Sequence, residues 1–157
     1  MAEREAVPSE PDAAPSQGDA VSSQLGPEAA GAIRRVAAEG LGCSESEVDP
    51  GVPRRLSGGA SRLTYLLEAR GPSSTARFVV QMERSGSAGS NLAMASQVQL
   101  LGLARQRGVP VPEVLASGGE PGSGFVVLEW LPGEAVVRRI MRDEALASVR
   151  TALAAEA

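Results

Sequence analysis

The stretch from Leu56 to Gly133 limits the possible folds most, because turn formers and short apolar runs alternate along it in a fixed order. Short apolar runs bounded by Gly, Pro, Asn or Ser are typical of strands. Five strands are predicted, over residues 54–57, 62–68, 76–82, 111–117 and 125–131. We expect these strands to form one antiparallel sheet.

One long helix is predicted between the third and fourth strands, over residues 92–107. Met94, Val98 and Leu101 stand at positions i, i+4 and i+7 and define its buried face. Asn91 is a suitable N-cap for this helix. The fold class that follows is α+β, a five-stranded antiparallel sheet with one long helix packed against it.

Composition divides the chain into three parts. Residues 1–26 are rich in Pro, Ser, Ala, Asp and Glu and hold few large apolar groups, so we expect a disordered tail. A domain is predicted over residues 27–133, and it starts with a helix at 27–40 whose first residue is a proline. Residues 134–157 show a helical pattern with a break near Asp143.

Composition also excludes several classes of protein. The net charge of -4 gives no electrostatic reason to expect nucleic acid or an anionic membrane as a partner. The chain has no His, which excludes a Ser-His-Asp triad and most zinc sites, and we predict no metal site within it. The N-terminus lacks the pattern of a secretory signal, and the single Cys43 fits a reducing compartment, so we expect a cytoplasmic protein.

Gly58, Gly59, Ala60 and Ser61 form a turn between the first two predicted strands. Glycine lets backbone N–H groups approach phosphate oxygens closely and adopt positive φ. These four residues are therefore candidates for a nucleotide-binding site. The alternative is an ordinary glycine-containing hairpin, since the motif matches neither the P-loop nor the kinase G-x-G-x-x-G pattern.

Glu129 and Trp130 follow the last predicted apolar run and precede the pair Pro132 and Gly133. An exposed connection after a buried strand can present backbone N–H and C=O groups to the edge of an adenine. Both residues are therefore candidate nucleotide-binding residues at a hinge. Alternatively, the Pro-Gly turn simply caps a strand, and Trp130 is a core or rim aromatic.

Arg138 and Arg139 stand in the helical pattern near the end of the chain. An arginine cluster on a helix can hold an anionic group, so both are candidate anion contacts. The alternative is a solvated helix face.

Taken in order, these segments resemble the aminoglycoside phosphotransferase-like family, also called the choline-kinase-like phosphotransferases. The resemblance covers residues 56–150. Within the family, the sequence is most similar to the branch whose members are often found beside acyl-CoA dehydrogenases. It is carried by G-G-A-S with Thr64, by V-V-Q, by G-V-P-V-P-E-V-L, by G-E at Gly133 and Glu134, and by V-R-R-I-M-R-D.

The resemblance implies a bilobal kinase-like fold that binds ATP and Mg²⁺ and transfers phosphate to a small-molecule hydroxyl. The family's strand cation falls on neutral Gln81, and its helix acid falls on Gln97 when counted back from Gly108. We expect the two amides to form a hydrogen bond that holds the helix without charge, and Arg84 is a candidate substitute cation. The alternative is that Gln81 and Gln97 are unrelated surface amides.

The family's catalytic loop, H-G-D-x-x-x-x-N, and its later metal-binding Asp are absent from this sequence. Because these groups orient the hydroxyl and hold Mg²⁺ in kinase-type transfer, we predict no catalytic residue in this chain and no turnover by it alone.

The favoured interpretation is the N-terminal lobe of an ATP-dependent small-molecule phosphotransferase in a truncated frame, with an unidentified acceptor. Its exposed lobe face is expected to bind the missing lobe or a second copy. One alternative is a nucleotide-binding or protein-interaction module without catalysis. Another is a plain α+β domain whose matches are coincidental.

Overall fold

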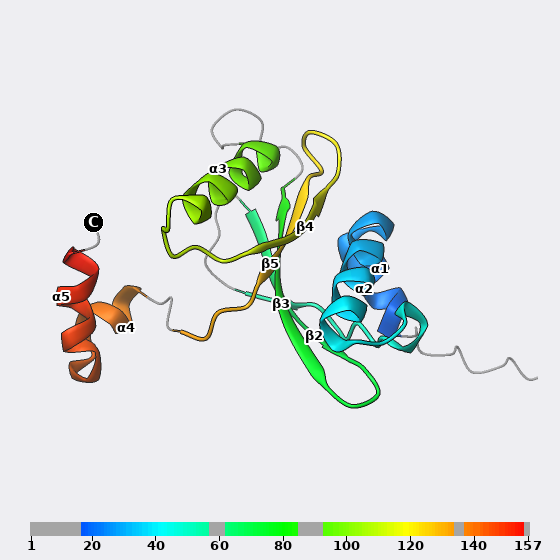
Figure 1. Ribbon diagram of the computed structural model, residues 1–157, viewed down its shortest axis with the longest axis horizontal. Coiled ribbons are helices and arrows are strands. Elements are labelled where there is room, and N and C mark those ends of the chain that lie inside the picture. The colour runs from blue at the N-terminus through cyan, green and yellow to red at the C-terminus, as the bar shows by residue number, and fades with distance from the viewer. Residues whose placement is uncertain (1–16, 57–61, 85–92, 134–136, 156–157) are drawn as a thin grey trace, which may run out of the picture.

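The computed structural model describes residues 17–56, 62–84, 93–133 and 137–155 (Figure 1). None of the described helices combines the length and the apolar character that a membrane crossing requires. The helices are α1 (Gln17–Leu25), α2 (Pro27–Leu41), α3 (Met94–Gln106), α4 (Val137–Arg142) and α5 (Ala147–Ala155), with 3₁₀ turns η1 (Glu45–Glu47) and η2 (Glu144–Leu146). The strands are β1 (Arg54–Arg55), β2 (Arg62–Arg70), β3 (Thr75–Glu83), β4 (Val114–Gly118) and β5 (Phe125–Glu129).

The five strands form one antiparallel sheet in the order β1-β2-β3-β5-β4, which confirms the predicted α+β class. β2 and β3 pair along their whole length, from Arg62 opposite Glu83 to Arg70 opposite Thr75. Successive side chains of a strand point to opposite faces. The register therefore decides which residues share a face of the sheet.

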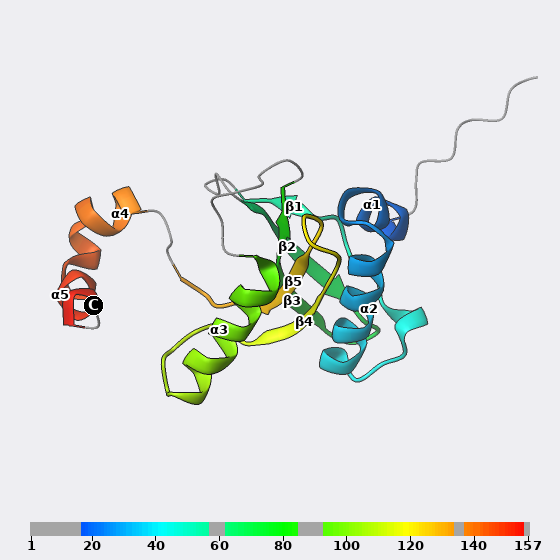
Figure 2. The same cartoon turned by 90° about the horizontal axis from the view of Figure 1, so that it is seen from above.

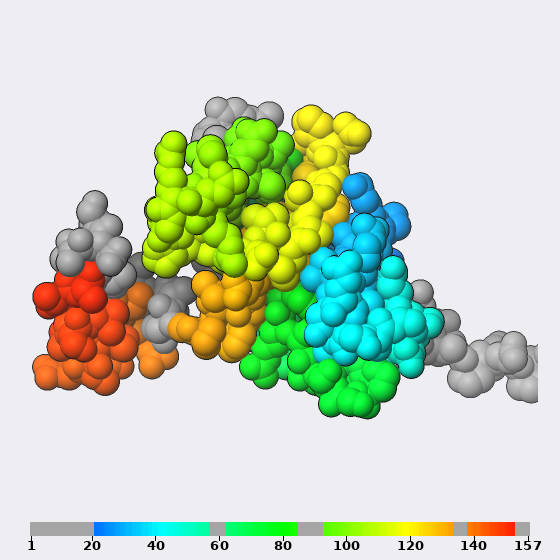
Figure 3. All heavy atoms as spheres, in the orientation of Figure 1, coloured from blue at the N-terminus to red at the C-terminus, as the bar shows by residue number. Residues whose placement is uncertain are grey.

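One face of the sheet packs against α2 and is called the α2 face. Figure 3 shows α1 and α2, in blue and cyan, lying directly against the strands. Ile33 of α2 is completely buried there, as are Leu67 and Val80 of the sheet. The sheet side chains in this core are Tyr65, Leu67, Ala69, Ala76, Phe78, Val80, Met82, Ala116, Phe125 and Val127.

Helix α1 corrects the prediction of a disordered tail. Val21 and Leu25 stand four residues apart, on one side of the helix, and both are buried in the same core as Ile33. Burial of these two side chains offsets the conformational entropy that the segment loses when it becomes ordered. The prediction for residues 1–26 is therefore wrong from Gln17 to Leu25, and residues 1–16 lie outside the described part.

The opposite face carries α3 and is called the α3 face. Met94 forms a buried cluster with Val126 and Leu128 of β5, and Val98 and Leu101 pack against it. This contact confirms the predicted buried stripe of the helix. Helix α3 packs mainly over β4 and β5 (Figure 2) and also contacts Arg62, the first residue of β2. In the part of the chain that the structure describes, β1 and the rest of β2 carry no helix on this face.

The start of α3 differs from the prediction. Asn91 lies outside the described residues, and the helix begins at Met94 with Ala93 as an N-cap that has no capping side chain. The cap comes instead from Glu83 at the end of β3, whose carboxylate accepts a hydrogen bond from the Met94 N–H.

The C-terminal helices follow the predicted pattern. The helical pattern is interrupted at Asp143, the N-cap of η2, whose side chain accepts a hydrogen bond from the Ala145 N–H. Arg150 of α5 donates to the carbonyls of Ile140 and Asp143, which ties α5 back to α4. In both Figure 1 and Figure 2 this helical pair lies to one side of the sheet.

Candidate functional site

Four of the five cross-strand pairs that β2 and β3 place on the α3 face form a row that changes from charged to polar to apolar and back to charged. Alternate residues along each strand share this face, so neighbouring pairs lie about 7 Å apart. In order from the end next to residues 57–61, the pairs are Arg62 with Glu83, Thr64 with Gln81, Leu66 with Val79, and Glu68 with Arg77.

Gln81 joins this row to α3. Gln97 Nε2 donates a hydrogen bond to Gln81 Oε1 at 2.8 Å, and both side chains are half-buried. The bond confirms the predicted contact between the two amides. It fixes the helix to the third strand without placing a charge between them.

Glu83 is a residue of the candidate site that the sequence patterns did not indicate. Its Oε1 accepts from the Met94 N–H at 2.8 Å, and its Oε2 accepts from the Gly122 and Gly124 N–H groups at 2.7 and 3.2 Å. Of the effects on this carboxyl, the Met94 bond is the largest, and together the bonds lower the pKa of Glu83 although burial opposes them. One carboxylate thus caps α3 and holds the turn between β4 and β5.

A second carboxylate holds the same turn from the α2 side. Glu28 Oε1, in the first turn of α2, accepts from the Gly119 N–H at 3.1 Å. Gly119 has a φ of 87°, which favours glycine. A Cβ atom on Gly118 would lie 2.5 Å from Glu28 Oε1, so the carboxylate reaches the turn only because Gly118 has no side chain.

Glu129 ends β5 and is bound to the segment before β4. Its N–H donates to the Glu113 carbonyl at 2.9 Å, and its Oε2 accepts from the Glu113 N–H at 3.2 Å. The Glu129 side chain therefore positions this neighbouring segment.

Trp130 lies at the rim of the α3 face, half-buried, and not in the core. The Arg77 guanidinium carbon is 5.1 Å from the centroid of its ring, within cation–π range. Arg77 Nε also donates to Glu68 Oε2 at 2.9 Å, and this bond is the main cause that lowers the pKa of Glu68. Together these groups border a hollow of about 450 Å³, lined by Val52, Arg54, Leu66, Glu68, Arg77 and Trp130.

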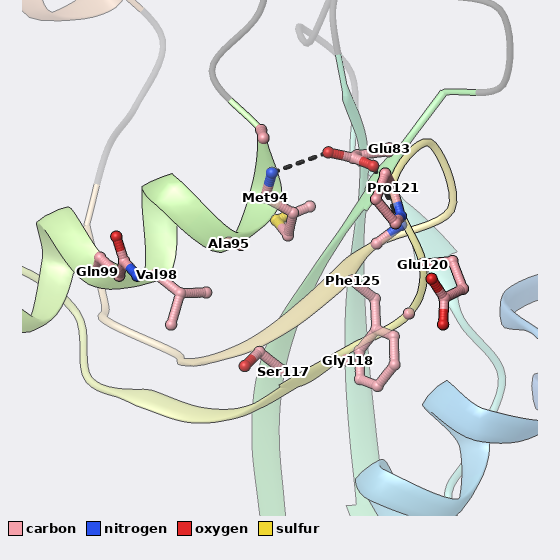
Figure 4. Close-up of a pocket in the computed structure, with 13 residues that line it drawn as sticks. Glu83, Met94, Ala95, Val98, Gln99, Ser117, Gly118, Glu120, Pro121 and Phe125 are labelled. Atoms are coloured by element: carbon pink, nitrogen blue, oxygen red, sulfur yellow. Dashed lines mark hydrogen bonds between the residues drawn. The ribbon is translucent and has the colours of Figure 1, made fainter.

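A separate pocket of about 340 Å³ lies between the start of α3 and the turn that joins β4 and β5 (Figure 4). Val98 lines it from α3 and Phe125 from β5, and its acidic side chains are Glu83 and Glu120. The described residues that line it include no arginine. The acidic lining of this pocket therefore disfavours a ligand with several phosphates.

Of the remaining predicted site residues, the described ones, Arg84, Arg138 and Arg139, are not brought to this row. Residues 58–61 lie outside the described part, so the glycine turn stays a prediction. Arg84 is exposed, one residue beyond β3. Arg138 and Arg139 are exposed on α4, and that helix lies away from the sheet in Figures 1 and 2.

Comparison with models of known protein families identifies the family of this chain. Residues 52–157 match the family model described as "Phosphotransferase enzyme family". The matched range holds all five strands together with α3, α4 and α5, and it begins after α1 and α2. Neither the curated proteins nor the solved structures contain a significant match.

Proposed function

Because the chain belongs to the phosphotransferase enzyme family, we propose that its sheet and α3 form the nucleotide-binding lobe of an ATP-dependent kinase for a small-molecule hydroxyl. The hydrogen bond from Gln97 to Gln81 carries this proposal. It joins the helix to the third strand where kinase-type lobes tie the same elements with an ion pair beside the phosphates. The same proposal includes membership of the branch of the family that is associated with acyl-CoA dehydrogenases.

The row of cross-strand pairs supports an orientation for the nucleotide. Leu66 and Val79 offer the base an apolar surface, and Trp130 borders the hollow at that end. Thr64 and Gln81 come about 7 Å further along the strands, which suits the start of a phosphate chain. The triphosphate would then extend toward the predicted glycine turn at residues 58–61, and the base edge would meet the main chain of Glu129 and Trp130.

The described residues do not fit a Mg²⁺ site. Among them no group of three or more acidic, His or Cys side chains is placed to hold a metal ion. Glu83, the acidic residue nearest to Gln81 along β3, has both oxygens occupied by backbone N–H groups. We therefore propose that this chain supplies nucleotide binding without turnover, and that the metal ligands and the catalytic Asp belong to another lobe.

The test uses Trp130, the single tryptophan of the chain. Saturating ATP is expected to change its fluorescence, and at about 100 times the dissociation constant it should add about 2.7 kcal/mol of stability. Leu66→Asp should abolish both effects, because it places a charge on the base surface. Leu115→Asp, the same change on an exposed position of β4, should retain them. The absence of both effects in the unmodified chain would contradict nucleotide binding.

A second function is favoured by the neutrality of the Gln81–Gln97 pair. A lobe without a cation at this position supplies less charge neutralisation to a transferring phosphate, as a binding module without catalysis would. An assay of phosphate transfer from ATP by the full-length gene product distinguishes the two functions. Transfer of the γ-phosphate of ATP to a hydroxyl acceptor would establish the kinase, and ATP binding without transfer would establish the module.

We also propose that a second lobe, or a second copy of the chain, covers apolar groups that are exposed here. Leu100 and Leu103 on α3 and Leu131 after β5 are about half exposed. Exposed apolar groups of this kind mark interaction surfaces when they are contiguous. Light scattering that shows only a monomer at high concentration would argue against self-association.

A further inference from the structure

Arg62 occupies the end of the row where the proposed triphosphate would lie. It is the first residue of β2 and stands opposite Glu83, one cross-strand pair beyond Thr64 and Gln81. Its side chain is 13% exposed, and its Nη1 lies 3.7 Å from Met94 Sδ. A cation is therefore already held on the α3 face, about 7 Å along the strands from the neutral Gln81.

Glu83 does not depend on this cation for its own stabilisation. Its two oxygens accept three backbone N–H groups, whereas Arg62 Nη1 is 3.8 Å from Oε1, beyond hydrogen-bond distance. Arg62 is also the smallest of the effects that lower the pKa of Glu83. A shift of the guanidinium toward an anionic ligand would therefore leave the Glu83 carboxylate satisfied.

The other described arginines of β1, β2 and β3 on this face are placed differently. Arg70, at the far end of β2, is exposed and forms an ion pair with Glu68. Arg77 is bound to Glu68 and lies over Trp130, at the opposite end of the row. Arg54 is exposed on β1 opposite Leu66, beside the apolar base surface. Arg62 is thus the arginine of the row that lies on the phosphate side of Gln81.

We propose that Arg62 provides the phosphate-contacting cation of this lobe, in place of the cation that Gln81 lacks. This inference rests on the proposed function, since it concerns the same nucleotide site. The planar guanidinium can donate two parallel hydrogen bonds to a phosphate, which a neutral amide cannot match in charge. In this arrangement the positive charge stands on β2, in the cross-strand pair next to Gln81, and not on β3 at Gln81 itself. The contact between β3 and α3 is then the neutral Gln81–Gln97 bond.

The experiment compares ATP with adenosine as probes of the 157-residue chain, with dissociation constants measured by calorimetry in the presence of Mg²⁺. Arg62→Gln should weaken ATP binding roughly tenfold or more, because a hydrogen bond to a charged group is lost. Adenosine binding should change by less than about twofold, since adenosine has no phosphate. Arg62→Lys should retain part of the preference for ATP because it keeps the charge.

Arg35→Gln is the matched control, since Arg35 is exposed on α2, on the other side of the sheet. It removes the same charge and should leave the ratio of ATP to adenosine affinity unchanged. Thermal unfolding of each variant distinguishes phosphate binding by Arg62 from a purely structural role. A purely structural role would lower the melting temperature of Arg62→Gln without changing the ratio of ATP to adenosine affinity.

The outcomes also separate this inference from the proposed function. If the unmodified chain binds ATP and Arg62→Gln keeps the same ratio of affinities, the role of Arg62 is overturned while nucleotide binding stands. If the unmodified chain binds neither ATP nor adenosine, the proposed function and the role of Arg62 are overturned together.

Discussion

The α2 face and the α3 face are built from the same strands and differ in almost every other respect. On the α2 face, Leu67 and Val80 are completely buried beneath α2. On the α3 face, their sequence neighbours Leu66 and Val79 are only half-buried. The row that holds Leu66 and Val79 also carries all the paired polar and charged groups of β2 and β3 described above.

This difference separates stability from ligand binding within one sheet. A fully buried apolar face stabilises the fold through the area it removes from water. A half-covered face with ordered polar groups contributes less to stability but leaves surface for a ligand. Variants that alter one face and then the other can test this division directly.

The largest effect is expected from two neighbouring leucines of β2. Leu67→Ala should lower the free energy of unfolding by about 3–5 kcal/mol, because it opens a cavity in a core that cannot easily collapse. Leu66→Ala should cost less, about 1 kcal/mol, since its side chain is only half-buried and opens no closed cavity. Urea denaturation followed by circular dichroism measures both. Equal losses would show that the two faces are not divided in this way.

Glu83→Gln should give the next largest loss, about 1–3 kcal/mol near neutral pH, because α3 and the turn lose their shared charged acceptor. The folded-state pKa of Glu83 is lowered, so its contribution is present above the ordinary value of 4.5 and is lost as the pH falls through the folded value.

Denaturation at several pH values provides the check on this contribution. The difference in stability between Glu83→Gln and the unmodified chain should shrink below about pH 4.5. Glu45→Gln, a change of an exposed carboxylate in η1, is the control and should stay close to the unmodified chain throughout. A difference that is constant with pH would contradict the role given to the Glu83 charge.

Gln97→Ala should have a smaller effect, about 0.5–1.5 kcal/mol, because one neutral hydrogen bond to Gln81 is lost. Gln99→Ala is its control, since Gln99 is exposed two residues further along α3. Hydrogen exchange should show faster opening of α3 in Gln97→Ala alone. Similar exchange in both variants would indicate that the amide pair does not hold the helix.

The smallest effect on stability is expected from Arg77→Gln, on the exposed rim of the α3 face. Arg77 is about half exposed, so its loss should leave the unfolding midpoint almost unchanged. The emission of Trp130 should shift nevertheless, because the guanidinium over its ring is removed. Arg70→Gln, which removes another exposed partner of Glu68, should leave the emission where it was.

Sequence patterns could predict the parts of this fold that depend on local periodicity. Strands β2, β3 and β5 and helix α3 have apolar patterns, whereas β1 consists of two exposed arginines. The Gln81–Gln97 contact was expected from the family resemblance, because the family's strand cation and helix acid fall on these two residues. Helix α1 was missed because its apolar side rests on Val21 and Leu25, too few residues to form a visible stripe.

The contacts of Glu83 and Arg62 could not be predicted in the same way. They depend on how β2 pairs with β3 and on where α3 begins, and both are set by tertiary packing. The sequence offered Asn91 as a suitable N-cap, so it gave no sign that α3 begins after Ala93 and takes its acceptor from another element. The sequence alone does not identify which carboxylate supplies it.

The turn between β4 and β5 has a practical consequence for protein engineering. Exposed, glycine-rich turns are the usual places to insert an affinity tag or a fluorescent label. This turn is unsuitable, because Glu28 and Glu83 bind its main chain from two sides and Gly118 has no room for a Cβ atom. An insertion there would break the hydrogen bonds by which Glu28 of α2 and Glu83, the cap of α3, hold this turn. The link between β2 and β3 at residues 71–74, exposed at Pro72, Ser73 and Ser74, is the better position for a label.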